Sequence, residues 1–505
     1  MIEDAKLNIL LDHHVGTRDF KIFGHFLEHF HRQIYGGVYE PQSPLADEHG
    51  FRKDVLDALL KIKTPVIRWP GGCFVSAYPW KKGIGKRRIP YYDKAWRVEE
   101  PNTFGTDEFI TLCREVSAEP YICTNAGTGT PEEMADWVEY CNLTIGEWAK
   151  LRKENGHNKP FGVRYWSIGN ENWAMHEMGS KTADEWARYV VEAGKMMKRV
   201  DPSIELSVAS IPDLDWNVKV LREAGELLDW ISIHGYWSRP SEAGEFQSNY
   251  NAIITRVFEP EYRIEKTEHI LGALGYLGKV RIAFDEWNLR NWCHPGFFKF
   301  DQVDHKLMNK NDLNSNYNMA DAVFTACFLN TCLRHCDTVG MANFSPVVNT
   351  VGAIYTYSEG IVLRPSYHVF DLFTNSTFEE IVHSVLTSPT FEVKTNSGDV
   401  KTSPYLDSIV TREISTNQLG IVLVNLHEEE TINCRIQGLE RHQYGRVQVR
   451  TLGADSVSAF NDIHHPHDVS IAESNLYNVD WNSFEFPSPP HSVSVLTTKL
   501  SDGLV

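Results

Sequence analysis

The first three quarters of this 505-residue chain alternate between short apolar runs and longer amphipathic stretches, and this alternation constrains the fold more than any other feature. The apolar runs, interpreted as strands, are Lys21–Gly24, Pro65–Trp69, Glu119–Thr124, Val163–Gly169, Glu205–Ala209, Trp230–His234, Arg281–Asp285 and Thr338–Ala342. A stretch with helical periodicity follows each of them, and one opens with a capping signal from Thr130 to Glu133. Eight successive strand–helix units predict an α/β fold, a (β/α)8 TIM barrel, because parallel strands need crossover connections.

Beyond about Phe373 the pattern changes to short runs that are rich in β-branched residues and separated by turn residues. These runs are Ser408–Ile414, Gly420–Val424, Thr431–Ile436, Val447–Leu452 and His491–Thr498. They predict a C-terminal antiparallel β-sandwich of jelly-roll type. The opening stretch Ala5–Leu10 alternates like a strand and is expected to add an edge strand to that sheet. The predicted domains are a barrel over 18–374 and a sandwich over 375–505 that includes 1–17.

Two glutamates stand where strands of the predicted barrel end. Glu171 follows the run that closes at Gly169, and Glu286 follows the run that closes at Asp285; each has Asn and Trp beside it. A carboxylate on an apolar strand is costly unless it is paired or used in chemistry. Glycoside hydrolysis needs two carboxyl groups, one to protonate the leaving oxygen and one to attack the sugar or activate water. For Glu171 taken alone, a structural ion pair is an equally good interpretation.

Other polar or aromatic residues follow the remaining predicted strands. They include Glu28, Arg68, Cys73, Asn170, His234, Tyr236, Trp287 and Asn343. The ends of parallel barrel strands meet on one rim, where active sites form, so their joint placement indicates a site. Each of these residues also has a structural interpretation. In that interpretation Arg68 neutralises a buried acid, Cys73 packs as a small apolar group, and Trp287 belongs to the core instead of stacking on a sugar.

The composition of the chain limits the classes of binding partner, the location and the cofactors that we expect. The net charge of −18 argues against nucleic acid and against an anionic membrane. The N-terminus carries acidic residues where a secretion signal carries basic ones, and no run approaches the roughly 18 apolar residues of a membrane span. The nine cysteines form no CxxC pair, as is typical of a reducing, cytoplasmic location. No phosphate-binding glycine motif occurs, and neither a metal nor another cofactor is expected.

Six segments closely resemble the α-L-arabinofuranosidases of glycoside hydrolase family 51. They are FGHFLEH (23–29), RWPGGCF (68–74), AWRVEEPNTFGTDEF (95–109), CTNAGTGTPEEMADWVEYCN (123–142), WSIGNENW (166–173) and FDEWN (284–288). The resemblance extends over essentially the whole chain. It implies a retaining, exo-acting enzyme that releases terminal arabinofuranose from arabino-oligosaccharides or from arabinoxylan and arabinan fragments. It also implies a homo-oligomer, commonly a cytoplasmic hexamer.

The same resemblance implies roles for residues on the rim. Glu171 is the implied acid/base and Glu286 the implied nucleophile. The implied substrate contacts are Glu28, Arg68, Cys73, Trp96, Asn170 and Tyr236, with Arg68 beneath the nucleophile and Trp96 near the mouth; Trp287 is added as a candidate sugar platform. As an acid, Glu171 is expected to have a pKa above its ordinary value of about 4.3, raised by the nearby charge of Glu286.

One position departs from the family pattern. Many relatives carry Gln in the loop after the eighth strand, where this chain has Pro346, which offers neither an amide nor an N–H donor. The alternatives are therefore a β-D-galactofuranosidase, a β-xylosidase or an endoglucanase acting at the same site. A non-catalytic sugar-binding protein is the alternative from another class, but such a protein is expected to have lost one of the two carboxylates.

Overall fold

Eight parallel strands close a barrel within the part of the chain that this computed structural model describes, namely residues 4–238, 250–295, 304–394, 400–439, 445–480 and 483–500. They pair in the order β10–β11–β2–β3–β6–β7–β8–β9. Their bounds are β2 Gly24–Phe26, β3 Val66–Trp69, β6 Glu119–Thr124, β7 Tyr165–Ile168, β8 Glu205–Ala209, β9 Trp230–Ser238, β10 Arg281–Arg290 and β11 Val339–Phe344. The barrel predicted from the strand–helix alternation is confirmed.

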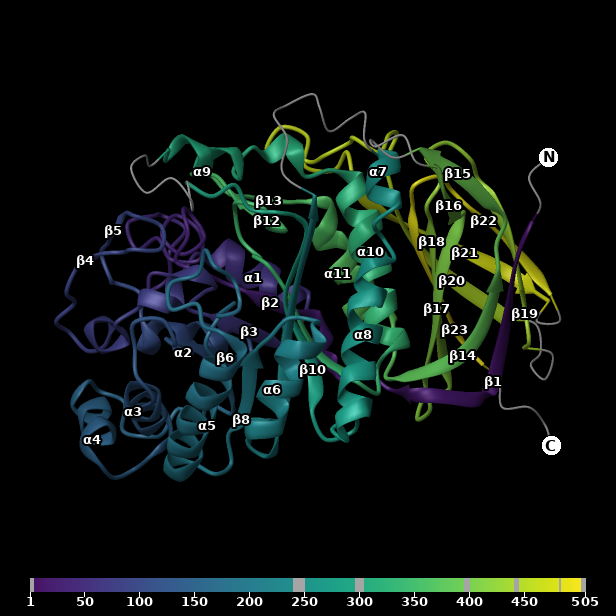
Figure 1. Cartoon of the computed structure of the whole chain (residues 1–505). Coiled ribbons are helices and arrows are strands. Elements are labelled where there is room, and N and C mark those ends of the chain that lie inside the picture. Colours follow the sequence, from purple (N-terminus) through teal and green to yellow (C-terminus); the bar gives the residue numbers. More distant parts are fainter. Residues whose placement is uncertain are drawn as a thin grey trace.

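Helices follow the strands and surround the barrel (Figure 1). They are α1 Lys53–Lys61, α2 Thr106–Glu115, α3 Pro131–Asn142, α4 Glu147–Glu154, α5 Ala183–Val200, α6 Leu214–Ala224, α7 Tyr250–Ile254, α8 Glu259–Leu274, α9 Lys306–Lys310, α10 Met319–Arg334 and α11 Pro365–Ser376. The capping signal at the start of α3 is present: the Thr130 hydroxyl accepts the Glu133 N–H, and the Glu133 carboxylate accepts the Thr130 N–H. No described helix is both long and apolar enough to cross a membrane.

The first barrel strand begins later than the sequence pattern predicts. Residues Phe20–Phe23 form a 3-10 turn, and the strand itself is Gly24–Phe26. The Asp19 carboxylate accepts a hydrogen bond from the Lys21 N–H at 3.1 Å and so starts the turn. The apolar residues of the turn are buried, so their character reflects packing and not strand pairing.

A mostly antiparallel sheet of nine strands follows the barrel in the described ranges, paired in the order β21–β20–β23–β18–β17–β14–β1–β19–β22. Its strands are β1 Ala5–Thr17, β14 Glu380–Thr387, β17 Leu406–Glu413, β18 Gln418–Asn425, β19 Ile432–Gln437, β20 Gly445–Gly453, β21 Ser470–Val479, β22 Phe484–Ser488 and β23 Val493–Lys499. Leu7 of β1, Leu423 of β18 and Phe486 of β22 belong to one apolar cluster, so distant strands share a core as they do in a sandwich.

The N-terminal strand β1 is not an edge strand, contrary to the expectation. It pairs antiparallel with β14 and parallel with β19, so it lies inside the sheet (purple among the green and yellow strands in Figure 1). Alternation along a strand shows which side is buried, but it does not identify the neighbouring strands. The first residues of the chain therefore complete a sheet that is otherwise built from its last quarter.

Helices α10 and α11 lie between the barrel and the sheet (Figure 1). Alternate residues of β18 face the two sides: Val422 and Val424 pack with the barrel core, whereas Ile421 and Leu423 pack inside the sheet domain. On α10, Arg334 forms an ion pair of 2.8 Å with Asp407 of β17. The sheet thus packs against the flank of the barrel that α10 and α11 form.

Candidate active site

The structure brings Glu171 and Glu286 together at the carboxyl ends of their strands. One carboxylate oxygen of each, with a ring nitrogen of His234, forms a group whose atoms all lie within 4.8 Å of one another. Glu286 belongs to β10, and Glu171 follows β7 directly. Glu171 has a backbone φ of 45°, a left-handed conformation that non-glycine residues adopt rarely and that is enriched at functional sites.

Glu286 is held by two donors. Arg68 Nη1 lies 2.6 Å from Oε1, and the Tyr236 hydroxyl donates to Oε2 at 2.8 Å. Tyr236 is fixed in turn by Ser345, whose hydroxyl lies 2.7 Å from the phenol oxygen. A Cβ at Gly72 would lie 2.9 Å from Glu286 Oε1, so only glycine lets the loop approach the carboxylate this closely. Glu286 is therefore positioned on three sides.

Two consecutive carboxylates of β10 both point into the barrel. Side chains of a regular strand alternate between faces, but the pairing of β10 with β9 shifts register just before Glu286. Asp285 Oδ2 consequently lies 3.4 Å from Arg68 Nε, while Tyr121 and Ser232 donate to Asp285 at 2.7 and 2.5 Å. Burial alone would raise the pKa of Asp285, but the Arg68 charge lowers it, and the resulting ion pair orients Arg68 towards Glu286.

Glu171 is surrounded by two histidines. His234 Nδ1 lies 2.9 Å from Oε1, and His176 Nε2 lies 3.4 Å from Oε2. Burial alone would raise the pKa of Glu171, but the contacts with His176 and His234 lower it below its ordinary value. The upward shift expected for Glu171 is therefore contradicted. Burial alone would lower the pKa of His234, but the nearby carboxylates of Glu286, Asp285 and Glu171 raise it to about 10.

Glu28, after β2, is fixed against the loop that follows β3. Its Oε1 accepts the N–H groups of Gly72 at 3.1 Å and Phe74 at 3.0 Å, and the indole N–H of Trp96 at 3.3 Å. A Cβ at Gly71 would lie 2.5 Å from Glu28 Cγ, and the φ of Gly71 is 154°. Burial and the charge of Glu286 raise the pKa of Glu28 well above its ordinary value.

Asn170 lies between Arg68 and Gly72. Its Oδ1 accepts a hydrogen bond of 2.9 Å from Arg68 Nη2. Its Nδ2 is buried and has no hydrogen-bond partner among the described residues, although a buried donor of this kind is normally satisfied. The amide is thus oriented by Arg68 and offers a donor to a bound molecule.

The two tryptophan predictions turn out differently. Trp96 is buried beside Glu28, and its ring stacks on Trp292 and His294 at centroid distances of 6.3 and 5.1 Å. Trp287 is contradicted as a sugar platform: its ring is fully buried and stacks on Phe328 of α10 at 3.6 Å. Because Trp287 follows Glu286 on a strand, its side chain points outwards into the layer between barrel and helices.

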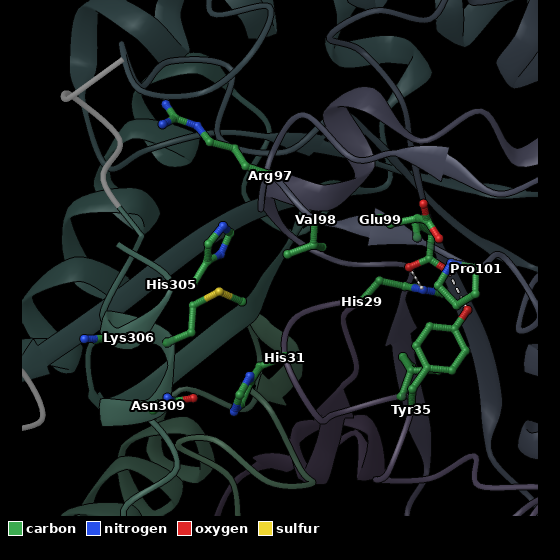
Figure 2. Close-up of a pocket in the computed structure, with 13 residues that line it drawn as sticks. His29, His31, Tyr35, Arg97, Val98, Glu99, Pro101, His305, Lys306 and Asn309 are labelled. Carbon is green, nitrogen blue, oxygen red and sulfur yellow. Dashed lines mark hydrogen bonds and ion pairs between the residues drawn. The ribbon is translucent and has the colours of Figure 1, made fainter. Parts of the chain in front are cut away.

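The structure also contains a cavity of about 630 Å³. Figure 2 shows Tyr35, Glu99 and Pro101 on one side of it and His305 and Lys306 on the other. His29 and Arg97 also line it, and they follow Glu28 and Trp96 directly in the chain. Neither Glu28 nor Trp96 lines the cavity itself.

Sequence reasoning placed His234 on the rim without assigning it a role, and it missed Ser345 and His176. His234 lies on β9 two positions before Tyr236 and therefore on the same face. Ser345 supplies a polar contact beside Pro346, and no pattern in the sequence indicates its bond to Tyr236. His176 lies in a loop without regular structure, so only the folded chain reveals its contact with Glu171.

Comparison with known proteins agrees with this geometry. The family described as "Alpha-L-arabinofuranosidase 1 domain" matches residues 58–253, and "Alpha-L-arabinofuranosidase C-terminal domain" matches residues 285–492. The chain is 32% identical to α-L-arabinofuranosidase C of Emericella nidulans, over 98% of both chains. It is also 32% identical to the intracellular exo-α-(1→5)-L-arabinofuranosidase 1 of Bacillus subtilis, over 99% of both.

Solved structures give the same result. The arabinose complex of the α-L-arabinofuranosidase from Thermotoga maritima superposes with a TM-score of 0.88 at 36% identity, covering 98% of this chain and 100% of that one. The family 51 enzyme from Xanthomonas axonopodis superposes with a TM-score of 0.85 at 26% identity, covering 98% and 99%. Two adjacent carboxyl groups at the mouth of a (β/α)8 barrel define a glycoside hydrolase. This chain belongs to the α-L-arabinofuranosidases of glycoside hydrolase family 51.

Proposed function

We propose that the chain releases terminal arabinofuranose with retention of configuration, with Glu286 as the nucleophile and Glu171 as the acid/base. The supporting observation is the separation of these side chains, since one oxygen of each lies within 4.8 Å of the other. Retaining glycosidases hold their carboxyl groups about 5–5.5 Å apart, whereas inverting enzymes leave about 6.5–9.5 Å for a water molecule. The site has space for direct attack on the sugar and too little for an intervening water.

In the first step Glu286 attacks the anomeric carbon while Glu171 protonates the departing oxygen, and a glycosyl ester forms. Arg68 and Tyr236 hold the carboxylate of Glu286, so little reorientation is needed before attack. His234, whose pKa is raised to about 10, is proposed to hold the proton, and its Nδ1 lies 2.9 Å from Glu171 Oε1. This hydrogen bond is the proposed route by which Glu171 acquires the proton.

In the second step Glu171, now ionised, takes a proton from water, which attacks the ester and releases arabinose. Forming the ester removes the charge of Glu286, while His234 keeps its contacts with Glu171 and Asp285. The loss of this charge favours the carboxylate form of Glu171, as a general base requires, and the proton that Glu171 takes from water returns to the now neutral His234.

The remaining sugar contacts are proposed from groups beside the two glutamates. The free Nδ2 donor of Asn170 is proposed to bind the sugar 2-hydroxyl, a bond that strengthens in the transition state. The buried Glu28 carboxyl is proposed to hydrogen-bond a second hydroxyl. Cys73 and Tyr236 complete the set of furanose contacts by similarity to the family, with Trp96 behind Glu28.

The preferred substrate and cellular setting are proposed from similarity. The B. subtilis relative is named an intracellular exo-α-(1→5)-L-arabinofuranosidase, and we extend a preference for arabino-oligosaccharides and a cytoplasmic location to this chain. A homohexamer is proposed from the family resemblance. Light scattering coupled to size exclusion tests the assembly, since a hexamer has six times the mass of the chain.

Substitution of the two glutamates tests the roles. Glu286→Ala is expected to abolish turnover of every substrate. Glu171→Ala should still form the ester from an activated aryl arabinofuranoside, and added azide should yield an arabinosyl azide of retained configuration. Glu147→Ala, at an exposed site on α4, is the control and should act as wild type. Normal hydrolysis of unactivated oligosaccharides by Glu171→Ala would refute the assignment.

A panel of nitrophenyl glycosides tests the sugar preference. The α-L-arabinofuranoside is expected to be cleaved fastest. A higher kcat/KM for the β-D-galactofuranoside or the β-D-xyloside would replace the proposed specificity, and binding of arabinose without turnover of any glycoside would favour a non-catalytic sugar-binding role.

A further inference from the structure

Three potential metal ligands lie together beside the acid/base and outside the double-displacement chemistry. They are Cys73, His176 and Glu177, and one ligand atom of each lies within 4.8 Å of the others. Cys73 begins the 3-10 helix Cys73–Ala77 after β3, and the other two lie in the loop after Glu171. Neither His176 nor Glu177 has a role in the proposed transfer of the sugar.

Glu177 is the most unusual member of this cluster. Glu177 is only 4% exposed, and neither of its carboxylate oxygens has a hydrogen-bond partner among the described residues. Burial raises its pKa to about 7; the nearby Ser76 and Cys73 side chains offset the shift only in part, without forming hydrogen bonds of ordinary geometry. A buried carboxyl with two unsatisfied oxygens is costly unless a ligand compensates it.

The charge around Cys73 favours a cation. Burial raises the pKa of its thiol well above the ordinary value, and Glu177, Glu28 and Glu171 add to the shift by repelling a thiolate. A divalent ion reverses this effect, because it stabilises the thiolate and the carboxylates together. Thiolate, imidazole and carboxylate ligands in one set suit Zn²⁺, and three protein ligands leave one tetrahedral position open.

We propose that Cys73, His176 and Glu177 bind a Zn²⁺ ion whose open position faces the furanose site, so that the ion excludes the sugar. On binding, the Cys73 thiol releases its proton to solvent and a sulfur–zinc bond forms, with no change of oxidation state. His176 also contacts Glu171 at 3.4 Å, which places the ion against the acid/base. The exclusion of sugar rests on the proposed function, whereas ion binding does not.

Calorimetric titration of the metal-free protein with ZnCl₂ tests the binding. We expect one site per chain, and we expect Cys73→Ser and Glu177→Gln each to weaken it by about tenfold or more. Substitution with Co²⁺ should give a thiolate-to-cobalt charge-transfer band that Cys73→Ser removes. The matched control is Cys113→Ser, which replaces a buried cysteine of α2. This variant should preserve both the zinc affinity and the thiolate-to-cobalt band. Unchanged affinity in both cluster variants, or no thiolate band, would overturn the proposal.

Inhibition is measured separately with nitrophenyl α-L-arabinofuranoside, and each variant is compared with its own zinc-free rate. Zinc should inhibit the wild type competitively, and Glu177→Gln should require at least about tenfold more zinc for the same inhibition. Zinc binding without inhibition would overturn the exclusion of sugar. A protein that binds zinc but hydrolyses no glycoside refutes the proposed function alone, whereas an active enzyme that binds no zinc refutes the zinc site alone.

Discussion

The side chains around Glu171 and Glu286 differ in a way that suits the two roles proposed for these carboxyl groups. Glu286 is fixed by Arg68 and Tyr236 in an orientation ready for attack. Glu171 instead contacts His234, whose pKa is raised to about 10, and the pair shares one proton across a 2.9 Å hydrogen bond. The proposed nucleophile is thus oriented by fixed donors, and the proposed acid/base lies beside a proton source.

The closeness of Gly72 to Glu286 gives a direct test of this positioning. In Gly72→Ala the new methyl group meets Glu286 Oε1 at 2.9 Å, and Arg68 and Tyr236 prevent the carboxylate from moving away freely. We expect kcat/KM to fall by about 100-fold, the cost of misplacing a reacting group by roughly 1 Å. Gly453→Ala, with open space around its Cβ, is the control and should keep wild-type kinetics. Activity of Gly72→Ala within twofold of wild type would refute the argument, provided that both variants melt normally.

Strands and helices were predictable from sequence where local pattern alone determines them. The predicted bounds of β6 (Glu119–Thr124) and β8 (Glu205–Ala209) match the structure, because each is an apolar run between turn residues. The acids that end β7 and β10 were found by the same reasoning. What failed depends on distant partners: β1 pairs with strands from the far end of the chain, and Trp287 faces α10. Pattern along a strand cannot specify which neighbour covers it.

The junction of α8 with the end of α10 carries a pH-dependent ion pair. His335, which caps α10, lies 2.9 Å from Glu268 and 3.5 Å from Glu261 of α8. Burial alone would lower the pKa of His335, but these two carboxylates raise it to about 9. A histidine whose pKa is higher in the folded chain stabilises the fold below its unfolded pKa of about 6.5, and this contribution disappears as the pH rises through 9.

Substitution of His335 should therefore cost stability only at lower pH. His335→Gln is expected to destabilise the protein by on the order of 2–3 kcal/mol near pH 6 and by much less near pH 9.5. Melting temperatures of wild type and variant across this range provide the measurement. His383→Gln, at an exposed position of β14, should leave the melting temperature unchanged throughout. A deficit for His335→Gln that stays constant with pH would show that packing, and not charge, explains its effect.

The path of the chain makes the two ends of the sequence depend on each other. Strand β1 precedes the barrel yet lies inside the sheet formed by the last quarter of the chain. Helices α10 and α11 then join that sheet to the barrel, with Arg334 and Asp407 paired across the contact. Consequently the C-terminal sheet cannot complete its pairing without β1, which precedes the barrel in the chain.

Point substitutions in β1 separate its role in stability from any role in catalysis. Leu7 is fully buried in the core of the sheet, so Leu7→Ala is expected to cost about 3 kcal/mol through lost burial and the cavity left behind. Leu10, three residues further on, is 39% exposed, and Leu10→Ala should change stability by no more than about 0.5 kcal/mol. Both variants should hydrolyse nitrophenyl arabinofuranoside at wild-type kcat below their melting temperatures, because neither residue approaches the barrel mouth. A loss for Leu7→Ala no larger than that for Leu10→Ala would contradict the contribution of the Leu7 side chain to the sheet core.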